Sequence, residues 1–264
     1  MIDLHTHVLP GIDDGPIELT EAVEMCRLAG ETGCEILVAT PHQFHPFWQN
    51  ADRKALEALR DKLQQEVGSA PQILLGAEIR VGATLLGDLA DRASSGALSL
   101  AGSSYVLIEF DREGIGPNPE TVIHELAVSG WRPIVAHPEF IANLAQNLSL
   151  MRSLQEQGAL FQVTAACVAG QLGRRPQREV AAMIDAGLVD FVASDAHGTQ
   201  WRPPGLQEAF TMIESRWGEA AAGRLTTANP LAVIENRPFL SEDVAADSSV
   251  AAPRQPGPRL VHRA

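Results

Sequence analysis

Two histidines near the start of the chain have a spacing that suits metal binding. His5 and His7 lie two positions apart in the opening run MIDLHTH. In a β-strand, alternate side chains point to the same face, so both imidazoles would point in one direction. Neutral imidazoles are good ligands for zinc, manganese or iron. One His-x-His motif is weak evidence by itself, and a structural role for the two rings is an equal alternative.

Acidic residues and histidines recur along the chain, and this repetition favours the metal hypothesis. Six of seven segments expected to be strands end in such residues, and the exception ends in Gln162 and Thr164. The six ends carry His5, His7, Asp13 and Asp14, then His42, Glu78, Glu109, then His137 and Glu139, and finally Asp195 and His197.

The charges at these strand ends indicate bound cations. Lysine is absent there, although a charged group enclosed by protein needs a partner. Metal ions explain the concentration of imidazoles and carboxylates better than ion pairs do. Nine candidate ligands among these eleven residues exceed what one ion requires and suit two or three ions that share carboxylates. The pattern is typical of a metal-dependent hydrolase.

The elements that must position these residues alternate between strand and helix. Most strand segments are continuous apolar runs, which is the pattern of parallel strands covered on both faces. The expected strands lie near Ile2–His5, Glu35–Thr40, Gln72–Ala77, Tyr105–Phe110, Pro133–Ala136, Leu160–Thr164 and Val189–Ser194. Apolar residues at helical spacing, with a glycine closing most segments, predict helices at Leu19–Gly33, Arg53–Val67, Pro119–Gly130, Leu148–Gly158 and Gln177–Gly187.

Seven strand–helix units in one chain favour a parallel barrel of the eight-stranded type, one strand short, over an open doubly wound sheet. In such barrels the functional side chains come from the carboxyl ends of the strands. We expect residues 1–240 to form this barrel. Residues 241–264 have no periodicity and are rich in Ala, Ser, Pro, Asp and Arg, which predicts a disordered tail.

Composition limits the classes of partner. The formal net charge of −13 disfavours nucleic acid and acidic membranes as ligands. No apolar run has the length of a membrane span, and the first residues lack the features of a signal peptide, so a cytoplasmic location is expected. Cys26, Cys34 and Cys167 are scattered and are expected to be reduced core thiols.

Several stretches together resemble a known family. They are MIDLHTHVLPGIDDGP, ATPHQFHP, GAEIR, YVLIEF, PIVAHPE, FQVTAACVAGQLGRR and FVASDAHGTQWRPP, in this order from Met1 to Pro204. The first and last are specific in combination, while each inner stretch is short. The chain resembles the PHP superfamily (polymerase and histidinol phosphatase) and, within it, bacterial tyrosine phosphatases encoded with capsule and exopolysaccharide genes.

The resemblance implies an α/β fold, a distorted (β/α)7 TIM-like barrel, that holds three divalent metal ions. Manganese is favoured, with zinc or iron as alternatives. The family pattern chooses Asp14 as a ligand, and Asp13 is expected to cap a turn or support a ligand. The implied ligand sets are His5, His7, Glu78 and Asp195 for one ion, Glu78, Glu109 and His137 for the second, and Asp14, His42 and His197 for the third.

The expected mechanism is an attack of metal-bound hydroxide on phosphorus. A cysteine nucleophile is not expected, because the residue five positions after Cys167 is Leu172 rather than arginine. Arg202 matches a phosphate-contacting position of the family. Arg80, two residues beyond Glu78, should point to the same side of its strand and is a second candidate for the phosphate clamp. Asp195 and His197 are expected to assist catalysis as well as bind metal.

Three aromatic residues bear on the substrate. The family commonly has an arginine directly after His-Pro-Glu, where this chain has Phe140, and the departure weakens the expected phosphate clamp. Phe47 and Trp48 follow His42 and are candidates for an apolar wall against a phosphotyrosine ring. A simple covering of the barrel rim is an equal alternative for these two residues.

The function that the resemblance implies is a protein-tyrosine phosphatase acting on a tyrosine autokinase of polysaccharide export. Two alternatives stay open at this point. One is a small-molecule phosphatase, such as one for histidinol phosphate, and the other is a non-catalytic metal-binding regulator, which Phe140 gives some weight. A nuclease role is disfavoured by the acidic charge, and the sequence leaves the oligomeric state open.

Overall fold

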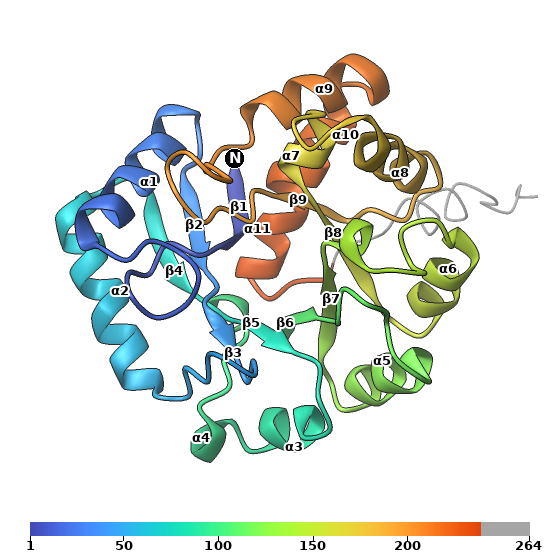
Figure 1. Ribbon diagram of the computed structural model, residues 1–264, viewed down its shortest axis with the longest axis horizontal. Helices are drawn as coiled ribbons and strands as arrows, with labels where there is room; N and C mark the ends of the chain where they lie inside the picture. The colour runs from blue at the N-terminus through green and yellow to red at the C-terminus, as the bar shows by residue number, and fades with distance from the viewer. Residues whose placement is uncertain (239–264) are drawn as a thin grey trace, which may run out of the picture.

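Parallel strands occupy the middle of the molecule, and helices surround them (Figure 1). The computed structural model describes residues 1–238. Every strand pair is parallel. The strands are β1 (Ile2–Thr6), β2 (Ile36–Ala39), β3 (His42–Gln43), β4 (Gln72–Leu75), β5 (Glu78–Arg80), β6 (Tyr105–Glu109), β7 (Arg132–Ala136), β8 (Leu160–Thr164) and β9 (Phe191–Ala193).

The strands form two sheets, and hydrogen bonds at the mouth connect one sheet to the other. The orders are β1-β2-β4 and β3-β5-β6-β7-β8-β9. At the mouth, the Asp195 amide donates to the His5 carbonyl at 2.9 Å, and the His7 amide donates to the Ala196 carbonyl at 2.8 Å, so β1 joins the chain after β9. Counting β2–β3 and β4–β5 as two interrupted strands gives seven, which confirms the distorted (β/α)7 prediction.

The two interruptions correct the predicted strand ends. The expected strands end at Thr40 and Ala77, just before His42 and Glu78. In the structure a further short strand begins at each of these two residues. Pro41 has no amide hydrogen to donate to the ladder. At Gly76, an added Cβ would lie 2.9 Å from Leu100 Cδ2 and 3.2 Å from Leu100 Cα, so a larger residue would require Leu100 to shift. His42 and Glu78 are therefore residues of β3 and β5, which are neighbouring strands of the second sheet.

The inner face of the strands is apolar near their starts and polar near their ends. Tyr105 and Leu107 belong to the buried apolar cluster inside the barrel, and Glu109 follows them on the same face of β6. Val233 of α11 (Asn229–Ile234) belongs to this cluster as well. The barrel is therefore filled with side chains at one end, while the other end is left for chemistry.

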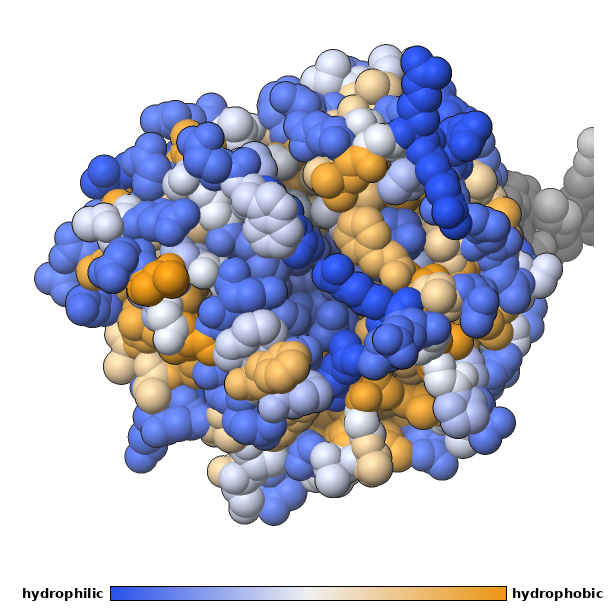
Figure 2. Space-filling model, in the orientation of Figure 1, coloured by the Kyte–Doolittle hydropathy of each residue, from blue (hydrophilic) through white to orange (hydrophobic). Residues whose placement is uncertain are grey.

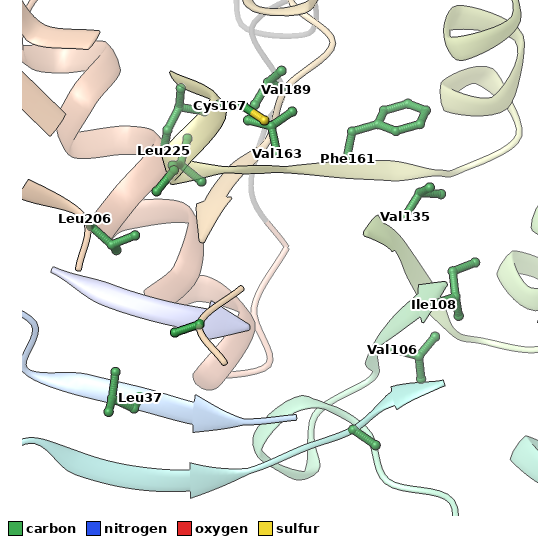
Figure 3. Packing of buried hydrophobic residues seen from close by; sticks show 14 of the residues in the cluster. Leu37, Val106, Ile108, Val135, Phe161, Val163, Cys167, Val189, Leu206 and Leu225 are labelled. Atoms are coloured by element: carbon green, nitrogen blue, oxygen red, sulfur yellow. The ribbon is translucent and has the colours of Figure 1, made fainter. Parts of the chain in front are cut away.

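Helices cover the outer face of the strands. Figure 3 shows Val106, Ile108 and Val135 projecting from their strands into this outer layer. The helices are α1 (Leu19–Glu31), α2 (Arg53–Val67), α3 (Leu85–Ala90), α4 (Arg92–Ser95), α5 (Pro119–Val128), α6 (Leu148–Glu156), α7 (Ala165–Val168), α8 (Arg174–Asp185), α9 (Gln207–Trp217), α10 (Glu219–Gly223) and α11, with short helical turns η1 (Leu100–Gly102), η2 (Pro138–Phe140) and η3 (Arg224–Ala228).

The predicted helices agree with the structure except at one start. The expected closing glycines Gly33, Gly130 and Gly158 all have positive φ, which supports their role at helix ends. Helix α8 begins at Arg174, three residues before the predicted Gln177. Gly173, with φ of 99°, ends the preceding turn and lets the helix start earlier.

Two further predictions concern the whole chain. The three cysteines are free and buried, as expected of core thiols. Across residues 1–238, every helix is too short or too polar to cross a bilayer. The predicted tail, residues 241–264, lies outside the described residues, so the boundary at residue 240 stays a prediction.

A buried carboxyl beneath the barrel predicts a pH-dependent stability. Burial raises the pKa of Asp190 to about 7, although its Oδ2 accepts a hydrogen bond from the Phe161 amide at 2.9 Å. The folded protein therefore holds a proton that the unfolded chain loses near pH 4. Stability should fall as the pH rises from about 4 through 7, by about 3 kcal/mol between pH 5 and pH 8.

Asp190→Asn should abolish that component, because an amide oxygen still accepts the Phe161 hydrogen bond and never ionises. Urea unfolding at pH 5 and pH 8, with the metal content held constant, compares the two proteins. All other titrating groups are shared, so the difference isolates Asp190. Equal pH dependence in both proteins would show that the carboxyl titrates normally.

Candidate metal centre

The nine predicted ligands all lie at the mouth of the barrel, where the strands end. Figure 2 shows a hydrophilic hollow in the middle of this face. Eight of the nine side chains are buried, and the exception is Asp14, whose side chain is 38% exposed. Ionisable groups buried in this number need either mutual pairing or a bound cation.

A β-bulge in β1 turns its two histidines into the mouth. Asp3 pairs with Leu37 and Thr6 pairs with Ala39, so β1 has one more residue than β2 over this stretch. Leu4 points into the barrel, and without the extra residue His5 would point outward. Bulges of this kind re-aim side chains next to active sites.

Three other residues of the mouth reach it through left-handed backbone conformations. His137, Asp195 and Arg202 have φ values of 36°, 54° and 53°. Such conformations are unfavourable for residues with a Cβ and persist only where the surroundings enforce them. After Ala136 on the inner face of β7, the left-handed turn allows His137 to point inward as well.

The first cluster joins β1 to the chain after β9. Ligand atoms of His5, His7 and Asp195 lie within 4.8 Å of one another. Glu78 Oε2 lies 3.3 Å from the Nε2 atoms of both His5 and His7. The structure thus brings together the four residues that the resemblance assigns to one ion.

The second cluster is centred on Glu78. Its Oε1 lies 2.8 Å from His137 Nε2, which agrees with the implied set. Ligand atoms of Glu78, His42 and Glu109 also lie within 4.8 Å of one another. The structure therefore places His42 between the second and third implied sets, because its Nδ1 faces Glu78 and Glu109 while its Nε2 faces Asp14.

The third cluster contains His7, Asp14, His42 and His197. Asp14 Oδ1 lies 3.4 Å from His42 Nε2 and 3.3 Å from His197 Nε2. These are the three residues expected for a third ion, joined by His7. The three clusters overlap through His7 and His42, which is the arrangement expected of neighbouring ions that share ligands.

Two orphaned atoms test whether a cation fits this mouth. Within residues 1–238, His42 Nδ1 and Glu109 Oε2 are buried and make no hydrogen bond. Buried polar atoms of this kind are rare and call for an explanation. Both atoms belong to one cluster of potential ligands, and their nearest polar neighbours are Glu78 for His42 Nδ1 and Arg80 for Glu109 Oε2, each at 3.2 Å. A cation between them would satisfy both.

The charges of the cluster also fit cation binding. Burial lowers the pKa of His5, so this imidazole is neutral and able to bind metal. Burial opposes ionisation of Glu78 too, but the surrounding His5 and His137 keep its pKa well below the usual range. At His7 burial is outweighed by Asp13 and Glu78, which raise the pKa to about 10. A bound cation would take the place of the His7 proton.

Two residues orient the β1 imidazoles from behind. Asp13 Oδ2 lies 2.9 Å from His7 Nδ1, and Asp13 Oδ1 accepts from the Gly15 amide, so Asp13 both supports a ligand and shapes the turn, as expected. Gln162 Oε1 lies 2.8 Å from His5 Nδ1. The sequence offered one signal for Gln162, a lone amide on the inner face of an apolar strand, and its supporting role was not predicted.

Replacing Gln162 by leucine should weaken metal binding by about 10- to 100-fold. The amide oxygen fixes the His5 tautomer that leaves Nε2 free for metal, and leucine removes that acceptor. A chelator competition titration measures the affinity. Gln65→Leu, at an exposed glutamine on α2, is the control. Equal affinities in both variants would contradict the supporting role.

Two arginines border the clusters, so the absence of lysine did not mean an absence of cations. Arg80 points to the same side as Glu78, as predicted, and contacts Glu109 at 3.2 Å and Asp111 at 2.5 Å. Arg202 contacts Asp195 and lies 3.4 Å from His197 Nε2. Two guanidinium groups thus lie beside the potential ligands, where they can reach a bound phosphate.

Aromatic side chains line part of the rim. Trp48 stacks on His42, with ring centroids 5.2 Å apart, and also on His45. Phe47 and Trp201 are 81% and 66% exposed. His45 packs against Phe47 and Trp48 and stacks directly on His42, with ring centroids 4.9 Å apart, so it supports a cluster residue from the side of the rim. The rim therefore offers apolar surface next to the metal clusters.

Comparisons with known proteins agree on one family. The family described as capsular polysaccharide synthesis, CpsB/CapC, matches residues 1–235. The tyrosine-protein phosphatase YwqE of Bacillus subtilis is 35% identical over 230 residues, which cover 86% of this chain and 89% of YwqE. The tyrosine-protein phosphatase CpsB of Streptococcus pneumoniae is 27% identical over 241 residues, covering 89% and 98% of the two chains.

Solved structures give the same result. A crystal structure from work on YwqE and CpsB, described as unique metal-dependent tyrosine phosphatases, matches with a TM-score of 0.84 at 33% identity and covers 92% of this chain and 97% of its own. A lactonase of Listeria monocytogenes matches with a TM-score of 0.53 at 13% identity, covering 90% and 95% of the two chains, which shows a shared fold alone.

Proposed function

The chain belongs to the CpsB/CapC family, and from that premise we propose that it is a metal-dependent tyrosine-protein phosphatase of capsule or exopolysaccharide synthesis. The observation that carries the proposal is the set of three overlapping ligand clusters around Glu78 at an arginine-bordered mouth. Metal ions beside guanidinium groups are suited to hold a phosphate and to stabilise the charge of its transition state.

Three divalent ions, with manganese favoured, are the proposed cofactors. The ligands are the nine residues expected from the sequence, with His42 facing two of the clusters. When bound, the ions supply a nucleophile derived from water and withdraw charge from the phosphate oxygens. Mixed imidazole and carboxylate ligands suit manganese but also accept zinc or iron.

The side chains around the ions have separate tasks in this proposal. Arg202 and Arg80 bind the non-bridging phosphate oxygens, which requires each guanidinium to turn from its carboxylate partner. Asp195 and His197 hold metal and lie within reach of Arg202, so they position this clamp as well. Phe47 and Trp48 provide apolar surface for the aromatic ring of the substrate.

A cysteine-dependent mechanism does not fit this chain. Cys167 is buried in the outer layer of the barrel, where burial raises the pKa of its thiol well above the usual range. A catalytic cysteine needs the opposite, a lowered pKa and access to substrate. The nucleophile is therefore assigned to the metal centre.

The proposed substrate is a phosphotyrosine protein, a tyrosine autokinase of polysaccharide export. The open, partly aromatic rim favours a protein segment over a small molecule such as histidinol phosphate, which a closed pocket would suit better. The cytoplasmic location stays a prediction from the sequence. The regulator hypothesis depends on Phe140 and would require metal binding without turnover.

The test compares rates on a phosphotyrosine peptide and on histidinol phosphate, using manganese-loaded protein. We expect turnover of the peptide that is lost in His42→Ala and kept in His124→Ala, an exposed histidine on α5. Turnover of histidinol phosphate alone would contradict the protein substrate. No turnover of either, with metal content confirmed, would support the regulator hypothesis.

A further inference from the structure

A groove borders the metal centre on the side of β6, β7 and β8. It has a volume of about 690 Å³ and is lined by residues that follow these three strands. Arg112 and Arg175 contribute guanidinium groups, Asn143 and Gln146 contribute amides, and Glu139 and Glu179 contribute carboxylates. Phe140, which directly follows the His-Pro-Glu motif, lines the groove as well. The groove therefore adjoins the mouth but has its own polar lining.

Arg112 is the arginine of this groove with an available charge. Its side chain is exposed, and its guanidinium carbon lies 5.7 Å from the centre of the Phe140 ring. Among residues 1–238, no carboxylate lies within ion-pair distance of it. Arg175, in contrast, is paired with Glu179 at 2.9 Å. A cation held on an aromatic face keeps its hydrogen-bond donors free for another anion.

Arg112 lies beside the clusters of potential ligands rather than over them. The Phe140 ring lies between Arg112 and His137, and its centre is 5.8 Å from that of His137. A phosphotyrosine phosphate bound at the clusters would lie on the His137 side of Phe140, out of reach of Arg112. A residue next to the phosphotyrosine in the substrate chain would be within reach of Arg112.

We propose that Arg112 binds an anionic group of the substrate next to the phosphotyrosine that is hydrolysed. The inference rests on the proposed phosphatase function and adds a specificity-determining residue to it. A guanidinium fork pairs equally well with a carboxylate and with a phosphate, so the group is an acidic side chain or a second phosphorylated residue. On a chain with a net charge of −13, such an unpaired cation next to the mouth selects for anionic substrates.

Three phosphotyrosine peptides of equal length test this assignment. One has neutral flanking residues, one has a flanking glutamate, and one has a second phosphotyrosine. We expect the manganese-loaded protein to prefer at least one anionic peptide over the neutral one by about tenfold in kcat/KM. Arg112→Ala should bring that ratio close to one, while Arg112→Lys should keep part of it.

Arg27→Ala is the matched control, because Arg27 is an exposed arginine on α1, away from the groove. It should keep the full preference, and added salt should weaken the preference in every protein that has Arg112. The glutamate and second-phosphate peptides show which anion is preferred. An unchanged ratio in Arg112→Ala would overturn the assignment.

Failure of the phosphatase proposal gives a different result. Protein that turns over none of the peptides contradicts the function, and calorimetric binding of the same peptides to the metal-loaded protein then tests Arg112 separately. Tighter binding of an anionic peptide, lost in Arg112→Ala, supports the assignment without turnover. Equal binding of all three peptides overturns it.

Discussion

Glu78→Gln is expected to lower kcat/KM on a phosphotyrosine peptide by about 10³-fold or more. Within residues 1–238, Glu78 is the one carboxylate that contacts four imidazoles, those of His5, His7, His42 and His137, at distances from 2.8 to 3.3 Å. Glutamine has the same shape but lacks the negative charge that would be shared by neighbouring ions. Metal analysis of the purified variant should show a reduced number of ions per chain.

Glu139→Gln is the matched control for this experiment. Glu139 is also a fully buried carboxyl at the mouth, but it belongs to none of the clusters, and its Oε1 accepts from the Thr164 amide at 2.7 Å. Burial raises its pKa, so glutamine mimics the protonated form well. The control should keep its metal content. Equal metal loss in both variants would show that Glu78 is not a special ligand.

Removal of metal by a chelator is expected to abolish activity and to lower the melting temperature by about 5–10 °C. A site saturated 100-fold above its Kd stabilises a protein by about 2.7 kcal/mol, and for a chain of this size each kcal/mol corresponds to about 2–4 °C. The structural reason is that a cation offsets the charge of the buried carboxylates and coordinates the buried imidazoles, which are left without this partner when it is removed. Calorimetric melting with and without chelator measures the shift.

The ions that restore both properties identify the cofactor. We expect manganese to restore more activity than zinc, and a titration to end near three ions per chain. Glu78→Gln serves as a second control, because its melting temperature should respond less to the chelator. A native melting temperature unaffected by chelation, together with undiminished activity, would contradict the metal-centre proposal.

The sequence was sufficient to predict the fold class and to name the residues that meet at the mouth. Apolar strand segments alternate with amphipathic helices, and parallel strands of a barrel end at one face. Acidic residues and histidines at those ends therefore had to come together, whatever the details of the packing. The choice of Asp14 over Asp13 as a ligand needed the family resemblance and stays a prediction; in the structure Asp14 faces His42, while Asp13 contacts His7 from behind.

Other features depended on contacts between distant segments. The sequence spacing puts His5 and His7 on one face of β1, but only the bulge against β2 turns that face into the barrel. Gln162 contacts His5 across 157 positions of the chain, and Arg112 contacts Phe140 from a different loop. Spacing along a strand fixes relative direction within it, whereas strand register and loop packing decide which face is the inside. Local periodicity therefore determined which residues could act, and the tertiary structure decided which of them point at one another.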